Sequence, residues 1–383
     1  MSGSQPLTML DDPLDRPRPI SIAQRLLAGL HLDGPLLAGL LVLCGLGLVV
    51  LYSASGQSSS LLTKQIVRLG VAAAGMLVIA QVPPKLLKIW TPWLFALGIA
   101  LLVAVLVAGD MGKGAQRWLD VGFVRFQPSE IMKLAVPMMA AWFLMDRPLP
   151  PRLTELGVLF AICMLPAALI AQQPDLGTSL LIAASGIIVI LLGGISVRLI
   201  VLFGGLAVAV APVLWMNMHD YQKQRVLTFL NPESDPLGSG YHIIQSKIAI
   251  GSGGLFGKGW LNGTQAKLEF LPERATDFIF AVMGEEFGLL GLATLMILYA
   301  LIVLRGLYIA IQAQDTYSRL LAGSISLTFF VYVFVNTGMV TGLLPVVGVP
   351  LPLISYGGTS MVTLMLGFGI LMSIHSHRKL VTQ

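Results

Sequence analysis

An aspartate, Asp277, stands where a polar segment gives way to a long apolar run over 278–304, so we expect it at the mouth of a helix. If that helix begins near Pro272, Glu273 lies one turn from Asp277 on the same face. A carboxylate in a partly desolvated mouth beside a second acid has a raised pKa, as a general base working near neutral pH requires. Asp277 could instead only complement the helix dipole, an effect of about 0.3–1 kcal/mol. The residues leave both readings open.

A second pair of charges opens another apolar run, over 129–145. Glu130 and Lys133 are three residues apart and share a helix face just after Pro128. Ionisable residues inside membrane spans are expensive, so each is a candidate functional residue. One interpretation is an ion pair that only stabilises the helices. The other is a polar cavity that opens outward below the loop containing Arg117.

The composition shows that these charges lie in a membrane protein. Of 383 residues, 56% are hydrophobic and only 11% are charged, which excludes a soluble globular fold. The net charge of +5 is typical of cytoplasmic loops rich in Lys and Arg, and we expect no nucleic-acid partner. The two cysteines, Cys44 and Cys163, form neither a disulfide framework nor a metal cluster.

The apolar runs predict an all-α polytopic membrane protein with about ten transmembrane helices, because only helices satisfy their own backbone in lipid. The runs are 35–54, 66–82, 89–108, 129–145, 156–171, 179–196, 198–216, 278–304, 319–342 and 358–375, with only Gly193–Arg198 dividing the sixth from the seventh. An even number places both termini on one side, with residues 1–33 and 377–383 as cytoplasmic tails around a membrane domain over 34–376.

Basic residues in the short loops set the orientation. Twelve cations then lie in the cytoplasm: Arg16, Arg18, Arg25, Lys85, Lys88, Arg147, Arg152, Arg198, Arg305, Arg319, Arg378 and Lys379. The short outer loops hold Lys64, Lys113, Arg117 and Arg125. Residues 217–276 form one long extracytoplasmic loop, in which Tyr241–Ile250 has helix-like apolar spacing suited to lying flat on a membrane. Loops of this length are usually functional or disordered, and its apolar and aromatic residues favour function.

Several motifs in order resemble those of the SEDS family (shape, elongation, division and sporulation proteins), and within it the rod-shape elongation branch. They are Tyr52–Ser55, Gly114–Asp120, Phe126–Glu130, Gln173–Ser179, Asp235–Gly238, Tyr241–Gly254, Leu271–Phe280 and Pro350–Gly358. The resemblance spans nearly the whole chain. It departs at Ala275, where family members usually carry His two residues before the essential aspartate.

The resemblance implies a peptidoglycan glycosyltransferase of the inner (plasma) membrane that joins lipid II units on its periplasmic side and works with a class B penicillin-binding protein. The family's essential acid maps onto Asp277, and its other motif charges map onto Arg117, Glu130 and Lys133. We expect Asp277 to act as general base in a single inverting displacement of undecaprenyl pyrophosphate. Substrate contacts are also expected from four residues of the outer segment: Lys247, Lys258, Glu273 and Arg274. The cations among these residues, or a bound divalent cation such as Mg²⁺ or Mn²⁺, would offset the pyrophosphate charge.

Two other functions use the same residues. A lipid II flippase would need polar groups through the full depth of the bundle, where this sequence concentrates them near the outer ends, except for Glu285 and Glu286. A scaffold that only holds a penicillin-binding protein would tolerate replacement of Asp277.

Overall fold

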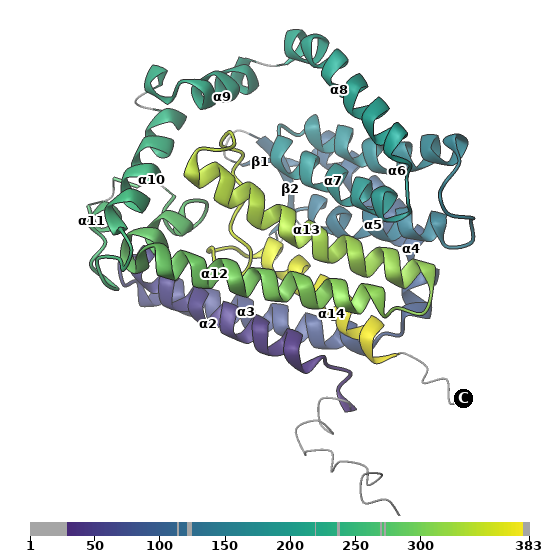
Figure 1. The fold of residues 1–383 in the computed structure, drawn as a ribbon, viewed down its shortest axis with the longest axis horizontal. Coiled ribbons are helices and arrows are strands. Elements are labelled where there is room, and N and C mark those ends of the chain that lie inside the picture. The colour runs from purple at the N-terminus through teal and green to yellow at the C-terminus, as the bar shows by residue number, and fades with distance from the viewer. Residues whose placement is uncertain are drawn as a thin grey trace, which may run out of the picture.

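The chain folds as a bundle of long helices in a computed structural model that describes residues 29–112, 115–120, 125–218, 220–235, 238–268, 270–271 and 273–377. Each of the ten apolar runs forms one helix (Figure 1). These helices are α2 Gly34–Ala54, α3 Ser59–Gln81, α4 Pro84–Ala108, α5 Ser129–Leu144, α6 Leu153–Ala171, α7 Leu176–Leu192, α8 Val197–Asn217, α12 Ile279–Ile311, α13 Thr316–Thr341 and α14 Thr359–Ser376. The division predicted near Gly193 is confirmed, because α7 ends at Leu192 and α8 begins at Val197.

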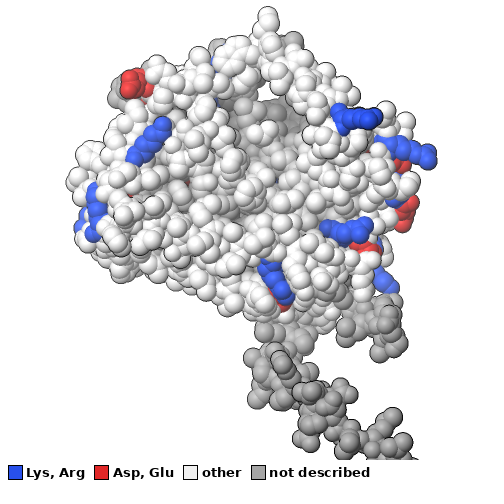
Figure 2. Space-filling model, viewed as in Figure 1, with Lys and Arg blue, Asp and Glu red and all other residues white. Residues whose placement is uncertain are grey.

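The helices have the length and composition of membrane spans. Within the described ranges, seven of them are long and apolar enough to cross a membrane, and two shorter apolar helices are Leu176–Leu192 and Val197–Pro212. The face in Figure 2 carries its charged residues around the margin and has an uncharged middle, as contact with lipid requires. The predicted class, an all-α multi-pass membrane protein, is confirmed.

Both described ends of the chain lie at the same end of the bundle. The rings of His31 and His377 stack with their centroids 4.6 Å apart. Beside them, Asp33 caps α2 by accepting a hydrogen bond from the amide of Leu36. The Asp33 carboxylate, 2% exposed, also accepts two hydrogen bonds from Arg305 of α12, at 3.0 and 2.5 Å. This arrangement agrees with an even number of spans. Of the predicted tails over 1–33 and 377–383, residues 1–28 and 378–383 lie outside the described residues.

Replacing Asp33 by asparagine is expected to destabilise the protein by about 3 kcal/mol at neutral pH, because Arg305 loses its carboxylate partner. Burial alone raises the pKa of Asp33, but the hydrogen bonds from Arg305 and Leu36 hold it below its ordinary value of 3.8. A depressed pKa gives stability that is present above the unfolded pKa and is lost as pH falls through the folded pKa. Melting curves in detergent should therefore show the gap between wild type and Asp33→Asn shrinking below about pH 4.

Asp146, which is exposed in the loop between α5 and α6 at this end of the bundle, provides the control. Asp146→Asn should leave the melting temperature unchanged across the same pH range. A pH-independent gap for Asp33→Asn would contradict the ionic role assigned to Asp33.

The long segment over 217–276, which the sequence predicts to be the outer segment, is largely helical. It contains α9 Asp220–Leu230, a 3₁₀ turn at Pro232–Ser234, α10 Ser239–Gly253 and the short α11 Thr264–Lys267. Whether Tyr241–Ile250 lies flat on a membrane stays a prediction, but part of its apolar spacing faces the protein. Ile243 and Ala249 are buried in the protein, and the hydroxyl of Ser246 donates to the carbonyl of Val340 on α13. Packing against α12 and α13 buries these residues within the protein.

Two features of the outer side differ from the sequence prediction. The loop before α5 forms a small antiparallel sheet, ordered β1 Asp110–Gly112, β2 Ala115–Asp120 and β3 Arg125–Phe126. In addition, α12 begins at Ile279, and Glu273 has a left-handed φ of 48° in the turn before it. Glu273 is therefore not one helical turn from Asp277, because residues 273–278 form turns before α12 begins. Pro272, where that helix was expected to begin, lies outside the described residues.

Candidate active site

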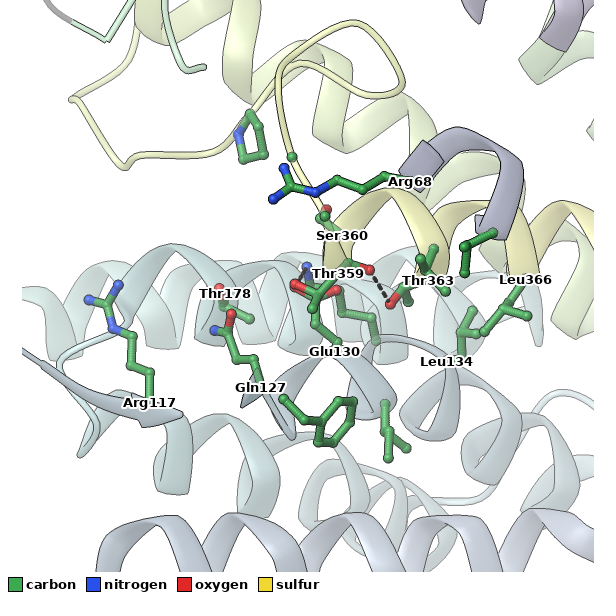
Figure 3. Close-up of a pocket in the computed structure, with 18 of the residues that line it drawn as sticks. Arg68, Arg117, Gln127, Glu130, Leu134, Thr178, Thr359, Ser360, Thr363 and Leu366 are labelled. Atoms are coloured by element: carbon green, nitrogen blue, oxygen red, sulfur yellow. Dashed lines mark hydrogen bonds and ion pairs between the residues drawn. The ribbon is translucent and has the colours of Figure 1, made fainter. Parts of the chain in front are cut away.

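A cavity of about 1540 Å³ lies between α3, α4, α5 and α14, beneath β2 and the loop that joins α13 to α14 (Figure 3). Its wall is polar in one part and apolar in the other. The polar part is formed by Arg68, Arg117, Gln127, Glu130, Lys133, Asp175, Thr178, Thr359, Ser360 and Thr363. The apolar part includes Val67, Val71, Leu87, Leu94, Leu134, Met138, Leu366 and Ile370. The cavity can therefore hold a molecule with a polar head and a hydrocarbon tail.

Arg117 is fixed at one side of the cavity by the start of α7. Its guanidinium donates to the backbone carbonyls of Gln173 and Pro174, and its Nε lies 3.6 Å from Oδ2 of Asp175. Asp175 is in turn the N-cap of α7 and accepts a hydrogen bond from Gln127 at 3.2 Å. The charge of Arg117 is thus largely compensated within the protein.

Glu130 and Lys133 form the predicted ion pair, with Nζ 2.7 Å from Oε1. The side chain of Glu130 is 7% exposed and that of Lys133 is 10% exposed. The ammonium group also lies 5.4 Å from the ring centroid of Tyr332 on α13. The second carboxylate oxygen of Glu130 is buried and accepts no hydrogen bond from the residues that the structure describes, although Glu130 lines the cavity. A buried ion pair with an unused acceptor is suited to contacting a polar ligand.

Asp277 lies at the edge of this cavity. A Cβ placed on Gly348, which lines the cavity, would be 3.5 Å from Oδ2 of Asp277. The amide of Asn336 holds this edge together by donating to the carbonyls of Asp277, at 2.9 Å, and Val349, at 2.7 Å. Gly348 has a φ of 75°, so glycine both permits this turn and leaves space beside the carboxylate.

The residues just before Asp277 are tied to the α13–α14 loop. The amide of Tyr356 donates to the carbonyl of Ala275 at 2.8 Å, and the hydroxyl of Ser355 donates to the carbonyl of Thr276. Asp277 is therefore positioned by α13 and by this loop as well as by the start of α12, which follows it. The position where the family usually has His is occupied here by Ala275, which contributes backbone only to this contact.

The other predicted substrate contacts lie outside the residues that line the cavity. Lys258 pairs with Glu285 at 2.7 Å, and Arg274 donates to the carbonyl of Ala266. The carboxylate of Glu273 accepts from the hydroxyl of Thr276 at 2.9 Å. Lys247 lies against the backbone of Gly342, where an added Cβ would be 2.8 Å from Nζ. The structure therefore brings Arg117, Glu130 and Lys133 together around the cavity and leaves these four apart.

The two carboxylates of α12 hold the outer segment. Glu285, which is fully buried, accepts hydrogen bonds from Lys258 and from the amides of Thr264 and Gln265. Glu286 accepts one from the hydroxyl of Ser53 on α2. Both lie near the outer start of α12, so these carboxylates do not extend a polar track toward the inner end.

Sequence reasoning missed Arg68. It lies within the apolar run 66–82 on α3 and lines the cavity. The rule that singled out Glu130 and Lys133, that charges within spans are functional candidates, applies equally to Arg68 and would have found it.

A divalent cation was a further expectation. Within the described ranges, no group of three or more His, Cys, Asp or Glu side chains is placed to hold a metal ion.

The chain matches known proteins along nearly its whole length. A family model described as "cell cycle protein", which groups FtsW, RodA and SpoVE, matches residues 35–380. The peptidoglycan glycosyltransferase MrdB of Escherichia coli (strain K12) is 56% identical over 354 residues, which cover 92% of this chain and 96% of that protein. MrdB of Helicobacter pylori (strain ATCC 700392 / 26695) is 41% identical over 297 residues, 75% of this chain and 76% of its own.

Solved structures give the same result. One matching chain belongs to a peptidoglycan synthase complex described by its structural coordination of polymerization and crosslinking. It aligns with a TM-score of 0.79 and 32% identity, and the alignment covers 90% of this chain and 97% of that chain. The rod shape determining protein RodA of Thermus thermophilus aligns with a TM-score of 0.69 and 28% identity, covering 91% and 98%. The family predicted from the motifs is thus confirmed, and this chain belongs to the FtsW, RodA and SpoVE family of cell cycle proteins.

Proposed function

We propose that this chain is a peptidoglycan glycosyltransferase that polymerises lipid II into glycan strands during cell elongation. The enzyme class is supported by the 56% identity to a protein of that name over 92% of the chain. One observation carries the finer proposal. A carboxylate, Asp277, borders a cavity that has a polar part for sugars and phosphates and an apolar part for a hydrocarbon tail.

The proposed chemistry is a single displacement. Lipid II carries its sugar on an α-linked pyrophosphate and the glycan linkage is β-1,4, so one inversion suffices and no covalent nucleophile is needed. Asp277 takes the proton from the 4-hydroxyl of the acceptor sugar as that oxygen attacks the anomeric carbon of the donor. The bond from this carbon to the pyrophosphate oxygen breaks, and the electron pair leaves with undecaprenyl pyrophosphate. This leaving group is a stable anion, so a protein general acid is not obligatory.

Arg117, Glu130 and Lys133 are proposed to position the substrate, because all three line the cavity. We propose no substrate contact for Lys247, Lys258, Glu273 or Arg274, which lie outside it. The end of the bundle that holds Asp277 is proposed to be the periplasmic side of the inner membrane, with both termini cytoplasmic. The excess of basic residues in the loops of the opposite end supports this orientation.

A class B penicillin-binding protein is the proposed partner. The support is the structural similarity to a chain of a peptidoglycan synthase complex described as coordinating polymerization with crosslinking. The main alternative function is a lipid II flippase. It is disfavoured because Glu285 and Glu286, the deepest carboxylates that it would use, are bonded to Lys258, Thr264, Gln265 and Ser53.

The two functions separate in detergent micelles, where no bilayer divides two compartments. The purified chain, with its partner, is incubated with labelled lipid II, and glycan strands and free undecaprenyl pyrophosphate are measured. A glycosyltransferase produces both in parallel. A flippase leaves lipid II unchanged, and that result would overturn the proposal.

A further inference from the structure

Among the described residues that line the cavity, one cation has no carboxylate partner within the part of the chain that the structure describes. Three cations and two carboxylates line the wall. Lys133 pairs with Glu130, and Arg117 lies against Asp175 and two carbonyls. The third cation is Arg68. Among the described residues its guanidinium has no ion pair or hydrogen bond, and it lies over the ring of Tyr356, with Cζ 4.6 Å from the ring centroid. An uncompensated guanidinium in a cavity favours an anionic ligand.

The surroundings of Arg68 add hydrogen-bond donors. Its side chain lies against the backbone at the start of α14, where a Cβ on Gly358 would be 3.6 Å from Nε. Among the described residues, no side chain caps α14, and the amides of Thr359 and Ser360 in its first turn have no intrahelical acceptor. Figure 3 shows Arg68 beside Ser360, with Thr359 nearer to Glu130. Guanidinium and helix amides together are the donor set that proteins use for phosphate groups.

The position of Arg68 is fixed relative to Asp277. One turn earlier on α3, Gln65, which is 2% exposed, donates to the carbonyl of Ser355 and accepts from the amide of Gly357. Tyr356 of that loop contacts Arg68 through its ring. The same loop donates hydrogen bonds to the carbonyls of Ala275 and Thr276. A single loop therefore links the guanidinium to the segment that carries the proposed base.

The neighbours of Arg68 indicate what carries the phosphate. Val67 and Val71 on α3, and Leu366 and Ile370 on α14, continue the cavity wall as an apolar surface. A free phosphate or nucleotide would gain nothing from this surface, whereas a phosphate ester on a hydrocarbon tail would be bound at both ends. The phosphate could belong to the polyprenyl pyrophosphate of the substrate or to an anionic phospholipid.

We propose that Arg68, with the amides of Thr359 and Ser360, binds the pyrophosphate of the polyprenyl-linked substrate and of the released polyprenyl pyrophosphate. This inference deepens the proposed function and assigns the leaving-group end of the cavity to the α3–α14 side. Arg68 is a substrate-binding residue here, because it contacts the pyrophosphate both before and after the glycosidic bond is formed and does not exchange a proton with the sugars.

The test measures binding of undecaprenyl pyrophosphate to the full chain in nanodiscs, with undecaprenol as the uncharged probe. Arg68→Gln is expected to weaken binding of the pyrophosphate about tenfold or more, because hydrogen bonds to ionised groups are among the strongest in proteins. Binding of undecaprenol should not change. Arg68→Lys should recover part of the loss, which shows that charge at this position is required. In polymerisation assays Arg68→Gln should raise KM for lipid II by a similar factor.

Lys64→Gln is the matched control. Lys64 lies one turn earlier on the same helix and is exposed. It lines an open hollow that it shares with Val67 and Arg68, but it does not line the main cavity, so it tests whether the phosphate binds in the cavity or in that hollow. This variant should bind undecaprenyl pyrophosphate like wild type. An equal loss in Lys64→Gln, or no loss in Arg68→Gln, would overturn the proposal.

A competition with phosphatidylglycerol distinguishes the two sources of phosphate. If phosphatidylglycerol displaces undecaprenyl pyrophosphate from wild type at matched concentration, the site is a phospholipid site and the proposal fails. Because the binding assay requires no turnover, its result does not depend on whether the chain forms glycan. A chain that binds the pyrophosphate through Arg68 but forms no glycan contradicts the glycosyltransferase and keeps this site.

Discussion

Replacing Asp277 by asparagine is expected to lower kcat for glycan formation about 100- to 10,000-fold, the range that a positioned general base contributes. Asparagine has nearly the shape of aspartate but cannot accept the proton of the acceptor hydroxyl. The main-chain contacts of this position, from Asn336 to its carbonyl and from the α13–α14 loop to the two preceding residues, do not depend on the carboxylate. The variant should therefore fold, bind lipid II with nearly the wild-type KM and fail to turn it over.

The measurement is the initial rate of glycan formation by the purified complex at saturating lipid II. Glu233→Gln removes an exposed acid from the same outer segment and should retain the wild-type rate. Equal losses in both variants would show that the effect comes from net charge near the membrane surface. A rise in KM at unchanged kcat for Asp277→Asn would instead make Asp277 a binding residue.

Replacing Lys133 by methionine is expected to destabilise the protein by about 3–5 kcal/mol, because it leaves the carboxylate of Glu130 buried without its partner. Glu130 is 5% exposed, so water compensates little of the loss. The double variant Glu130→Gln, Lys133→Met removes both charges and should recover most of this stability, since a buried ion pair is often replaceable by uncharged residues of similar size. Unfolding in detergent, followed by melting temperature, gives both values.

The double variant also decides between the two interpretations of this pair. If the pair contacts substrate, the variant is stable and folded but polymerises lipid II far more slowly than wild type. If the pair only stabilises the bundle, stability and polymerisation return together. The unused oxygen of Glu130 in a cavity-lining position leads us to expect the first result.

The helices could be predicted because each apolar run is long enough to require one. The pairing of Glu130 with Lys133 followed from their spacing on one helix face, which is a local property. The family followed from ordered motifs along the chain, and the comparisons confirm it.

What the sequence could not supply was the packing between helices. Nothing in the apolar pattern indicates that α3 and α14 lie side by side, so the meeting of Arg68 with the start of α14 was not foreseen. Lys258 was expected at the substrate because it is a cation in an outer loop, but a buried carboxylate from α12 binds it. Glu273 was placed by assuming an earlier helix start, and its left-handed backbone shows why that assumption failed.

The most direct test of the account follows polymerisation and flipping in the same preparation. Sealed vesicles containing the chain, its partner and labelled lipid II are sampled for glycan strands and for movement of lipid II between leaflets, with wild type and Asp277→Asn in parallel. The account predicts glycan strands from wild type and none above background from Asp277→Asn. Glycan formation by Asp277→Asn at the wild-type rate, or transport by wild type without any glycan, would contradict it.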